Sequence, residues 1–296
     1  MKNRLITNSI AIGGQFGRLF LVVIAILLFS GCFQSDPKPF SFNTAEFGRV
    51  GDSIRFSGYD WKIKVFETAK WGPGPNYFSG HERDVTIDEN GYLHLKIVQR
   101  NSKWMSTEVF NTQYMGYGTY TFTTEGNLDQ LPANVVFGLF TFDFSSFQQE
   151  ANSEVDIEFS KWGVDKLNRT THYAVQPVNF GTYYEERTNA PKYESGMADG
   201  VTTHQFEWTD TAVNWSSYTG EVIGEGEKIA SWRFGLDNPA RTKEENGNTS
   251  NPVIIPKPGS ETHARINLWL MDNQDIGPRD GLGQEVIVRK FNYEPL

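Results

Sequence analysis

Short alternating runs of apolar and polar residues dominate the chain from about residue 40 to its end, and clusters of Gly, Asn, Asp and Pro separate them. No apolar pattern of helical periodicity lasts for three turns. The run at 92–98 is the clearest strand, because the turn sequence Asp-Glu-Asn-Gly precedes strict alternation. Many short strands without intervening helices predict an all-β fold, a sandwich of antiparallel sheets. The predicted strands are 61–66, 92–98, 116–124, 134–142, 153–160, 170–176, 204–208, 212–215, 265–270 and 285–293.

The N-terminal 31 residues are typical of an export signal. Lys2, Arg4 and Arg18 precede the apolar run 19–29, which is too short to span a bilayer comfortably as a mature helix. The run ends in Leu-Phe-Ser-Gly-Cys, which resembles a bacterial lipoprotein signal, where small residues precede a cysteine that becomes lipidated and N-terminal. Because Cys32 is the only cysteine, it has no disulfide partner. An ordinary secretory signal and a membrane anchor with a buried free thiol are the alternatives.

Three segments follow from this interpretation. We expect 1–31 to be removed as a lipoprotein signal peptide, 32–40 to be a lipidated tether, and 41–296 to be one domain in the cell envelope. Within that domain, the segment 238–262 is rich in Asn, Pro, Glu and Lys and predicts a long surface loop.

Charge and aromatic content restrict the partners. Loss of 1–31, which carries three basic and no acidic side chains, changes the formal net charge from −9 to −12. An acidic surface argues against nucleic acid and is compatible with a neutral polymer. Eight Trp and twelve Tyr suit a protein that stacks flat ligands, although most of these rings are expected in the core.

Three carboxylates at alternate positions, Glu154, Asp156 and Glu158, have apolar residues between them. In a β-strand, all three side chains point to one face. Like charges along one strand face repel, so a purely structural strand does not favour this pattern. Retaining glycoside hydrolysis instead needs a nucleophilic carboxylate and a general acid/base carboxyl about 5–5.5 Å apart. The spacing is compatible with that chemistry, and a solvated strand face or a calcium site are the alternatives.

Further segments surround this strand in a fixed order. They are Glu108, the Gly-Tyr-Gly-x-Tyr run 116–120, the buried run 134–142, the His-x-Phe-x-Trp run 204–208, the Ile-Asn-Leu-Trp run 266–269 and the closing run 286–293. Together with Glu-x-Asp-x-Glu they resemble glycoside hydrolase family 16. The resemblance covers most of the mature chain and implies a concanavalin A-like jelly roll with a concave substrate cleft.

The resemblance also implies roles. Glu154 would be the nucleophile, Asp156 the assisting carboxylate and Glu158 the acid/base, with Asp156 able to hydrogen-bond one Glu and to help keep the other protonated. The uninterrupted motif is similar to the branch with a regular catalytic strand, which includes 1,3-1,4-β-glucanases and xyloglucan-active enzymes. Laminarinases and agarases belong to the branch with a bulge there, so they are less favoured.

Five side chains outside the motif are predicted to bind substrate. Glu108 matches a sugar-binding Glu, although an exposed strand carboxylate is the alternative. Trp104 would stack on a sugar or cover the sandwich edge, Tyr117 would line the cleft, and Trp162 would be a stacking platform just beyond the carboxylates. His172 would contact substrate, although a lone His is more often structural.

One departure concerns the donor side of the cleft. Where lichenase-like members carry an Arg two residues after the Glu that matches Glu108, this chain has Phe110. An apolar ring cannot donate the same hydrogen bonds, so we expect different donor subsites.

The sequence therefore predicts a monomeric, retaining, endo-acting glycoside hydrolase of β-glucan-type polysaccharides, membrane-attached through lipid on Cys32. It needs no cofactor, and no His or Cys cluster suggests a catalytic metal. A structural calcium ion is compatible with the scattered Asp residues. The alternatives are a catalytically inactive carbohydrate-binding lipoprotein and a transglycosylase that uses the same site.

Overall fold

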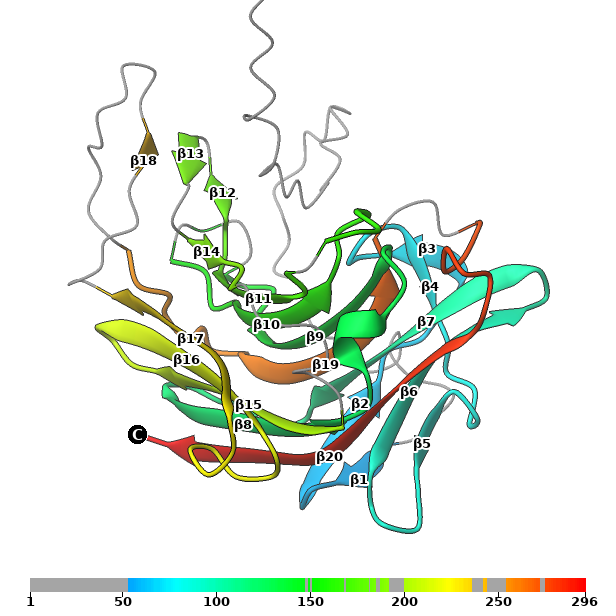
Figure 1. Cartoon of the computed structure of the whole chain (residues 1–296), viewed down its shortest axis with the longest axis horizontal. Helices are drawn as coiled ribbons and strands as arrows, with labels where there is room; N and C mark the ends of the chain where they lie inside the picture. The colour runs from blue at the N-terminus through cyan, green and yellow to red at the C-terminus, as the bar shows by residue number, and fades with distance from the viewer. Residues whose placement is uncertain are drawn as a thin grey trace, which may run out of the picture. The chain divides into compact units, whose positions relative to one another are not determined.

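The computed structural model describes residues 53–146, 149, 151–167, 169–180, 182–184, 187–191, 200–235, 242–243, 254–271 and 275–296 (Figure 1). All of them belong to one compact unit, Phe33–Leu296. The predicted signal peptide 1–31, the lipidated Cys32 and the tether 32–40 lie outside the described residues and stay predictions.

One antiparallel sheet carries the three carboxylates, and we call it the site sheet. Its strands, in spatial order, are β1 (Ile54–Phe56), β2 (Tyr59–Ile63), β7 (Lys103–Asn111), β19 (His263–Leu270), β9 (Val135–Phe142), β10 (Val155–Ser160), β11 (Thr171–Val175) and β14 (Thr188–Asn189).

A second antiparallel sheet, the outer sheet, lies beneath the first (Figure 1). Its spatial order is β5 (Val85–Ile87), β6 (Leu93–Arg100), β20 (Gln284–Pro295), β8 (Gly118–Glu125), β15 (Val201–Trp208), β16 (Ala212–Thr219) and β17 (Lys228–Gly235). Pairing of β6 with β7 joins the two sheets at one side. The sandwich predicted from the sequence is confirmed.

The remaining elements are small. They are β3 (Phe66–Trp71), β4 (Asn76–Phe78), which pairs in parallel with β7, the three-stranded sheet of β12 (Asn179–Phe180), β13 (Thr182–Tyr184) and β18 (Thr242–Lys243), and the 3-10 turn η1 (Leu128–Gln130). Across the described ranges, no helix is long and apolar enough to cross a membrane.

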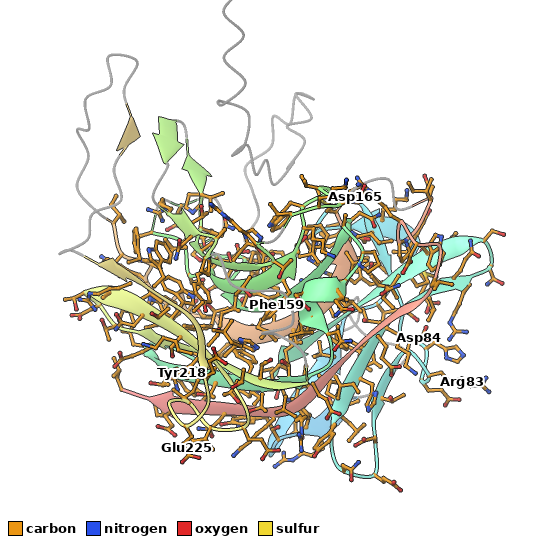
Figure 2. The ribbon with its side chains drawn as sticks, viewed as in Figure 1. Arg83, Asp84, Phe159, Asp165, Tyr218 and Glu225 are labelled. Carbon is orange, nitrogen blue, oxygen red and sulfur yellow. The ribbon has the colours of Figure 1, made fainter. Side chains whose placement is uncertain are left out.

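The core between the sheets fixes which face of β10 points outward. Val155, Ile157 and Phe159 are fully buried, and the Phe159 ring lies 4.8 Å from the ring of His204 on β15 (Figure 2). Burying each of these apolar side chains contributes about 1.5–3 kcal/mol. Because side chains alternate along a strand, this anchoring directs the carboxylates to the opposite face of the site sheet.

Each predicted strand overlaps an observed one, but the sequence missed the long strands β7 and β17 and the strands of two or three residues, which are β1, β4, β5, β12, β13, β14 and β18. Every residue of β7 after Lys103 is buried, so β7 shows no alternation by which to recognise it. The predicted run 61–66 is divided in the structure, because β2 ends at Ile63 and β3 begins at Phe66.

The described end of the predicted loop 238–262 is not wholly a surface segment. Ile255 is buried, and the carbonyl oxygen of Pro256 accepts a hydrogen bond from the indole of Trp208 at 3.1 Å. Thr242–Lys243 forms β18, and residues 238–241 and 244–253 lie outside the described part.

Candidate active site

The catalytic strand has the predicted regular form, with one correction at its start. β10 pairs without a register shift with both β9 and β11, so it carries no bulge. Glu154 precedes β10 rather than lying within it. The backbone carbonyl oxygen of Glu154 still accepts a hydrogen bond from the backbone N–H of Gln176 at 3.0 Å, so the strand geometry extends to Glu154. Glu154, Asp156 and Glu158 therefore share one face of the site sheet.

A row of side chains crosses the site sheet at the level of Glu158. Glu158 pairs with His172 on β11 and with Gly138 on β9. On the far side of β9, Gly138 pairs with Asn267 on β19, and Asn267 pairs with Glu108 on β7. A Cβ atom on Gly138 would lie 2.5 Å from Oδ1 of Asn267. Because Gly138 has no side chain, the Asn267 side chain on β19 can occupy the space next to β9.

The next row passes through Asp156. It contains Ala174 on β11, Phe140 on β9, Arg265 on β19 and Phe110 on β7. Arg265 thus lies directly beside Phe110, the residue that stands where the family resemblance would place an arginine. Sequence reasoning missed Arg265, although a basic residue between the apolar residues Ala264 and Ile266 of a predicted strand is a signal that could have found it.

Glu108 forms a closed ion-pair network. Its Oε2 accepts from Nζ of Lys64 and its Oε1 from Nη1 of Arg265, each at 2.8 Å, and Glu108 is only 1% exposed. Burial would raise the pKa of Glu108, but the charges of Lys64 and Arg265 outweigh it and hold that pKa below its usual value. Glu108 is therefore not the exposed strand carboxylate that the sequence offered as the alternative, and its predicted sugar contact stays a prediction.

Burial raises the pKa of all three carboxyls, and for Asp156 it does so to about 7. The charges of Asp156 and Glu158 raise the pKa of Glu154 further, whereas the positive charge of Arg265 lowers it. For Glu158, burial and the charge of Asp156 both act upward. The pKa of both Glu residues is therefore raised well above its usual value, and the cation of Arg265 only partly opposes the rise at Glu154.

Asp156 does not form the predicted hydrogen bond to one of the two Glu residues. Its Oδ2 accepts from Nε2 of Gln176 at 3.1 Å, and within the described residues it makes no hydrogen bond to Glu154 or Glu158. The reason is geometric, because side chains two positions apart on a strand start about 6–7 Å from one another.

Comparisons with known proteins bear on the fold. No protein-family model matches the chain, and no curated protein matches its sequence. A Bacillus licheniformis β-glucanase is 15% identical, with a TM-score of 0.53 over 84% of this chain and 100% of that one. A laminarinase from Flavobacterium sp. UMI-01 is 10% identical, with a TM-score of 0.54 over 83% and 99% of the two chains. This chain has the jelly-roll fold of the β-glucanases.

That β-glucanase fold does not by itself establish activity. A structure described as a pseudo β-1,3-glucanase of Mycobacterium tuberculosis is as similar as the others, at 16% identity and a TM-score of 0.53 over 85% of this chain and 97% of that one. The side chains on the site sheet must therefore carry any functional conclusion.

Within this β-glucanase fold, Trp162 and His172 lie at the Glu158 end of the catalytic strand. The Trp162 ring packs edge-on against His172, with centroids 5.7 Å apart, and against Trp269, at 6.4 Å. His172 bonds the Ser160 carbonyl at 3.0 Å, and burial lowers its pKa to about 4, so it is neutral at pH 7. The structure thus brings both residues to the predicted neighbourhood.

Trp162 also has an unusual backbone. It is only partly buried and adopts a φ of 46°, a left-handed conformation that costs energy for a non-glycine residue. Its indole nitrogen is buried and has no hydrogen-bond partner among the described residues.

Two residues predicted to bind substrate pack against other parts of the protein. Trp104 is 8% exposed, and a Cβ on Gly277 would lie 2.1 Å from its indole, so the loop at Gly277 covers it. Tyr117 directly precedes β8 of the outer sheet, where its ring packs edge-on against Trp208 at 5.5 Å. For Trp104 this packing is the alternative that the sequence offered, and substrate binding by Tyr117 stays a prediction.

Over the described ranges, no group of three or more His, Cys, Asp or Glu side chains could hold a metal ion. Among these residues the structure therefore identifies no set of ligands for the calcium ion that the sequence allowed.

Proposed function

We propose that this protein is a retaining, endo-acting glycoside hydrolase of β-glucan-type polysaccharides. The observation that carries the proposal is the regular strand β10, which presents Glu154, Asp156 and Glu158 on one face of a β-glucanase fold. The raised pKa of these carboxyls supports a site that can hold a proton for transfer.

The proposed roles follow the order that the family resemblance implies. Glu154 is the nucleophile, which must be ionised to attack. Glu158 is the general acid, which must hold a proton, and burial together with the charge of Asp156 favours its protonated form.

The reaction would proceed in two displacements. Glu154 attacks the anomeric carbon while Glu158 gives its proton to the departing glycosidic oxygen, which forms a glycosyl-enzyme ester. Glu158, now a carboxylate, then removes a proton from water as that water attacks the same carbon and releases Glu154. Two inversions give net retention. Asp156, whose pKa is raised to about 7, can exchange a proton with solvent between the two steps and so change the net charge of the three carboxyls.

The substrate assignment is supported by the fold and by the form of the catalytic strand. Solved structures with this fold include a β-glucanase and a laminarinase. The regular form of β10 favours the 1,3-1,4-β-glucanase branch over the bulged one. We further propose that the protein is exported, attached to the membrane through lipid on Cys32, monomeric and independent of cofactors.

The test compares Glu154→Ala with Glu158→Ala on mixed-linkage β-glucan, with azide added as a small nucleophile. If Glu154 is the nucleophile, azide attacks the substrate directly in Glu154→Ala and gives a glycosyl azide of inverted configuration. In Glu158→Ala, azide intercepts the ester and gives the retained configuration. Glu227→Gln, an exposed change beside the outer sheet, is the matched control and should keep full activity. Wild-type-like hydrolysis by Glu154→Ala would refute the assignment.

A carbohydrate-binding protein without turnover is the second candidate. Similarity to a protein described as a pseudo-glucanase favours it. Its signature would be binding of the wild-type chain to a glucan without any release of reducing ends, whereas longer products from oligosaccharide donors would indicate a transglycosylase.

A further inference from the structure

The side-chain amide of Gln176 has a fixed orientation toward Asp156. Its Nε2 donates to Oδ2 of Asp156 at 3.1 Å, and its Oε1 accepts from the backbone N–H of Val178 at 3.1 Å. A backbone N–H can only donate, so Val178 requires the amide oxygen on its side. The amide nitrogen must then face Asp156, and the group that Gln176 presents to this carboxyl is a donor.

The backbone of Gln176 is held at two points. Its N–H donates to the carbonyl oxygen of Glu154 at 3.0 Å, and its own carbonyl oxygen accepts from Nη2 of Arg187 at 2.9 Å. Arg187 is itself 1% exposed, and its guanidinium carbon lies 5.5 Å from the centre of the Phe234 ring. Because both the backbone and the side chain of Gln176 are fixed, the donor is already in place beside Asp156.

Asp156 is also held from the core side of the site sheet. The indole of Trp215 on β16 donates to the backbone carbonyl oxygen of Asp156 at 3.0 Å. Trp215 is 2% exposed, and its ring stacks on the rings of Tyr173, at 5.9 Å, and Trp232, at 4.8 Å. The outer sheet thus fixes the backbone of Asp156, and rotation of its side chain is the freedom that remains. The bond from Gln176 to Oδ2 restricts that rotation.

Titratable and charged side chains lie on the strands around Asp156. Within the described residues they are Glu154 and Glu158 on its own strand, His172 on β11, Arg187 before β14, His263 and Arg265 on β19, Glu108 on β7, Lys64 after β2 and, on the core side, Tyr173 and His204. In that part of the chain, the carboxyl of Asp156 makes its hydrogen bond to Gln176 and to none of these groups. A donor bonds a carboxylate more strongly than a carboxylic acid, so it favours the ionised form.

We infer that Gln176 is a positioning residue, which holds the Asp156 carboxyl in one orientation and stabilises its ionised form. Burial raises the pKa of Asp156 and the bond from Gln176 lowers it, with the result that this pKa is about 7. Without the bond, Asp156 would stay protonated over a wider range of pH. The inference rests on the proposed function for its catalytic meaning, since Asp156 there exchanges a proton between the two steps, but the bond can be tested without turnover.

The first measurement follows the side-chain amide of Gln176 by NMR in ¹⁵N-labelled wild-type protein. Its signals should shift between about pH 5 and 9, because the acceptor changes from a carboxylic acid to a stronger carboxylate acceptor. In Asp156→Asn, most of that shift should be lost. Amide signals that do not move with pH in the wild-type chain, or that move equally in Asp156→Asn, would overturn the inference. The result is independent of whether any variant at Gln176 folds.

The second measurement removes the donor. Gln176→Met keeps the length of the side chain, and the titration midpoint of Asp156 should rise by about one pH unit or more. The midpoint is read in protein labelled with ¹³C at the Asp side-chain carboxyls, with the signal assigned by its loss in Asp156→Asn. Gln205→Met is the matched control, because Gln205 donates to Oγ1 of Thr121 at 2.9 Å on the outer sheet. An unchanged midpoint in folded Gln176→Met, or an equal rise in Gln205→Met, contradicts the inference.

Gln176→Glu separates the donor from the contact with Val178. A Glu side chain still offers an oxygen to the Val178 N–H, but it offers Asp156 no N–H. The midpoint of Asp156 should therefore rise at least as far as in Gln176→Met. A smaller rise would mean that the contact with Val178 sets the midpoint, and the role of the donor would be rejected. Circular dichroism and urea unfolding establish which variants are folded.

Activity gives an independent readout. On a hydrolysed glucan, the pH dependence of kcat/KM should move upward in Gln176→Met in step with the NMR midpoint, and it should stay in place in Gln205→Met. If the wild-type chain hydrolyses no glycan, the proposed function fails while the titrations still decide the role of Gln176. If hydrolysis is found and the midpoint of Asp156 does not move, only the role of Gln176 fails.

Discussion

Arg265 lies directly opposite Phe110 on the paired strands β19 and β7, with its guanidinium carbon 5.2 Å from the centre of the Phe110 ring. The sequence indicated that Phe110 removes a hydrogen-bond donor from the cleft. The structure instead places a guanidinium on the neighbouring strand and covers it with that ring. The two positions thus form a cation and aromatic pair, and changes at one should depend on the other.

Phe110→Arg tests this dependence. A second guanidinium would face Arg265, and both oxygens of Glu108 are already occupied. An unpaired cation in this buried setting should lower the free energy of unfolding by about 2–4 kcal/mol. Adding Arg265→Met leaves one guanidinium near Glu108 and should recover more than half of that loss. Urea denaturation measures both variants, and additive effects of the two changes would contradict the coupling.

Gly138→Ala tests the row through Glu158. The new methyl would lie 2.5 Å from Oδ1 of Asn267, between that side chain and the catalytic strand. We expect a loss of about 1–3 kcal/mol in unfolding free energy and reduced hydrolysis, since the neighbours must shift. Gly116→Ala is the control, because its methyl would meet only Pro258, at 3.9 Å. Equal behaviour of the two variants would show that Asn267 moves aside freely.

Trp162→Ala should weaken polysaccharide binding. Its ring packs against His172 and Trp269 beside the Glu158 end of the strand. Losing one aromatic contact costs about 0.5–1.5 kcal/mol, which corresponds to a dissociation constant about two- to thirteenfold larger. Calorimetry in the Glu154→Gln background measures binding without turnover. Trp232→Phe on the outer sheet is the control, and an equal loss there would exclude a local role for Trp162.

The sequence predicted much of the fold because period-two alternation is a local property of a strand with unequal faces. The strand at 153–160 was identified for that reason, and its regular register is confirmed. β7 was missed because it is buried on both faces, so it carries no alternating signal.

The site was predicted less completely, because its electrostatics arise between strands that are distant in sequence. Arg265 and Glu108 are 157 positions apart and meet only through the pairing of β7 with β19. A local motif identified Glu108 but could not show that two cations occupy its oxygens. The packing of Trp104 and Tyr117 could not be predicted for the same reason, since their neighbours Gly277 and Trp208 are distant in the sequence.

Asp156 should make the stability of this protein depend on pH in an uncommon direction. Burial raises its pKa to about 7, whereas an Asp in an unfolded chain titrates near 3.9. Between about pH 4 and 7 the folded state holds a proton that the unfolded state has lost, so the free energy of unfolding falls as pH rises. A shift of this size corresponds to about 4 kcal/mol, and we expect at least about 2 kcal/mol. Asp156→Asn has no proton to lose and keeps a hydrogen-bonding group beside Gln176. Urea unfolding at pH 4.5, 6 and 7.5 should therefore show a gap in stability between Asp156→Asn and the wild-type chain that moves in favour of the variant as pH rises. A gap that stays constant with pH would mean that Asp156 is ionised throughout, and the proposed charge adjustment within the carboxylate trio would then have to be abandoned.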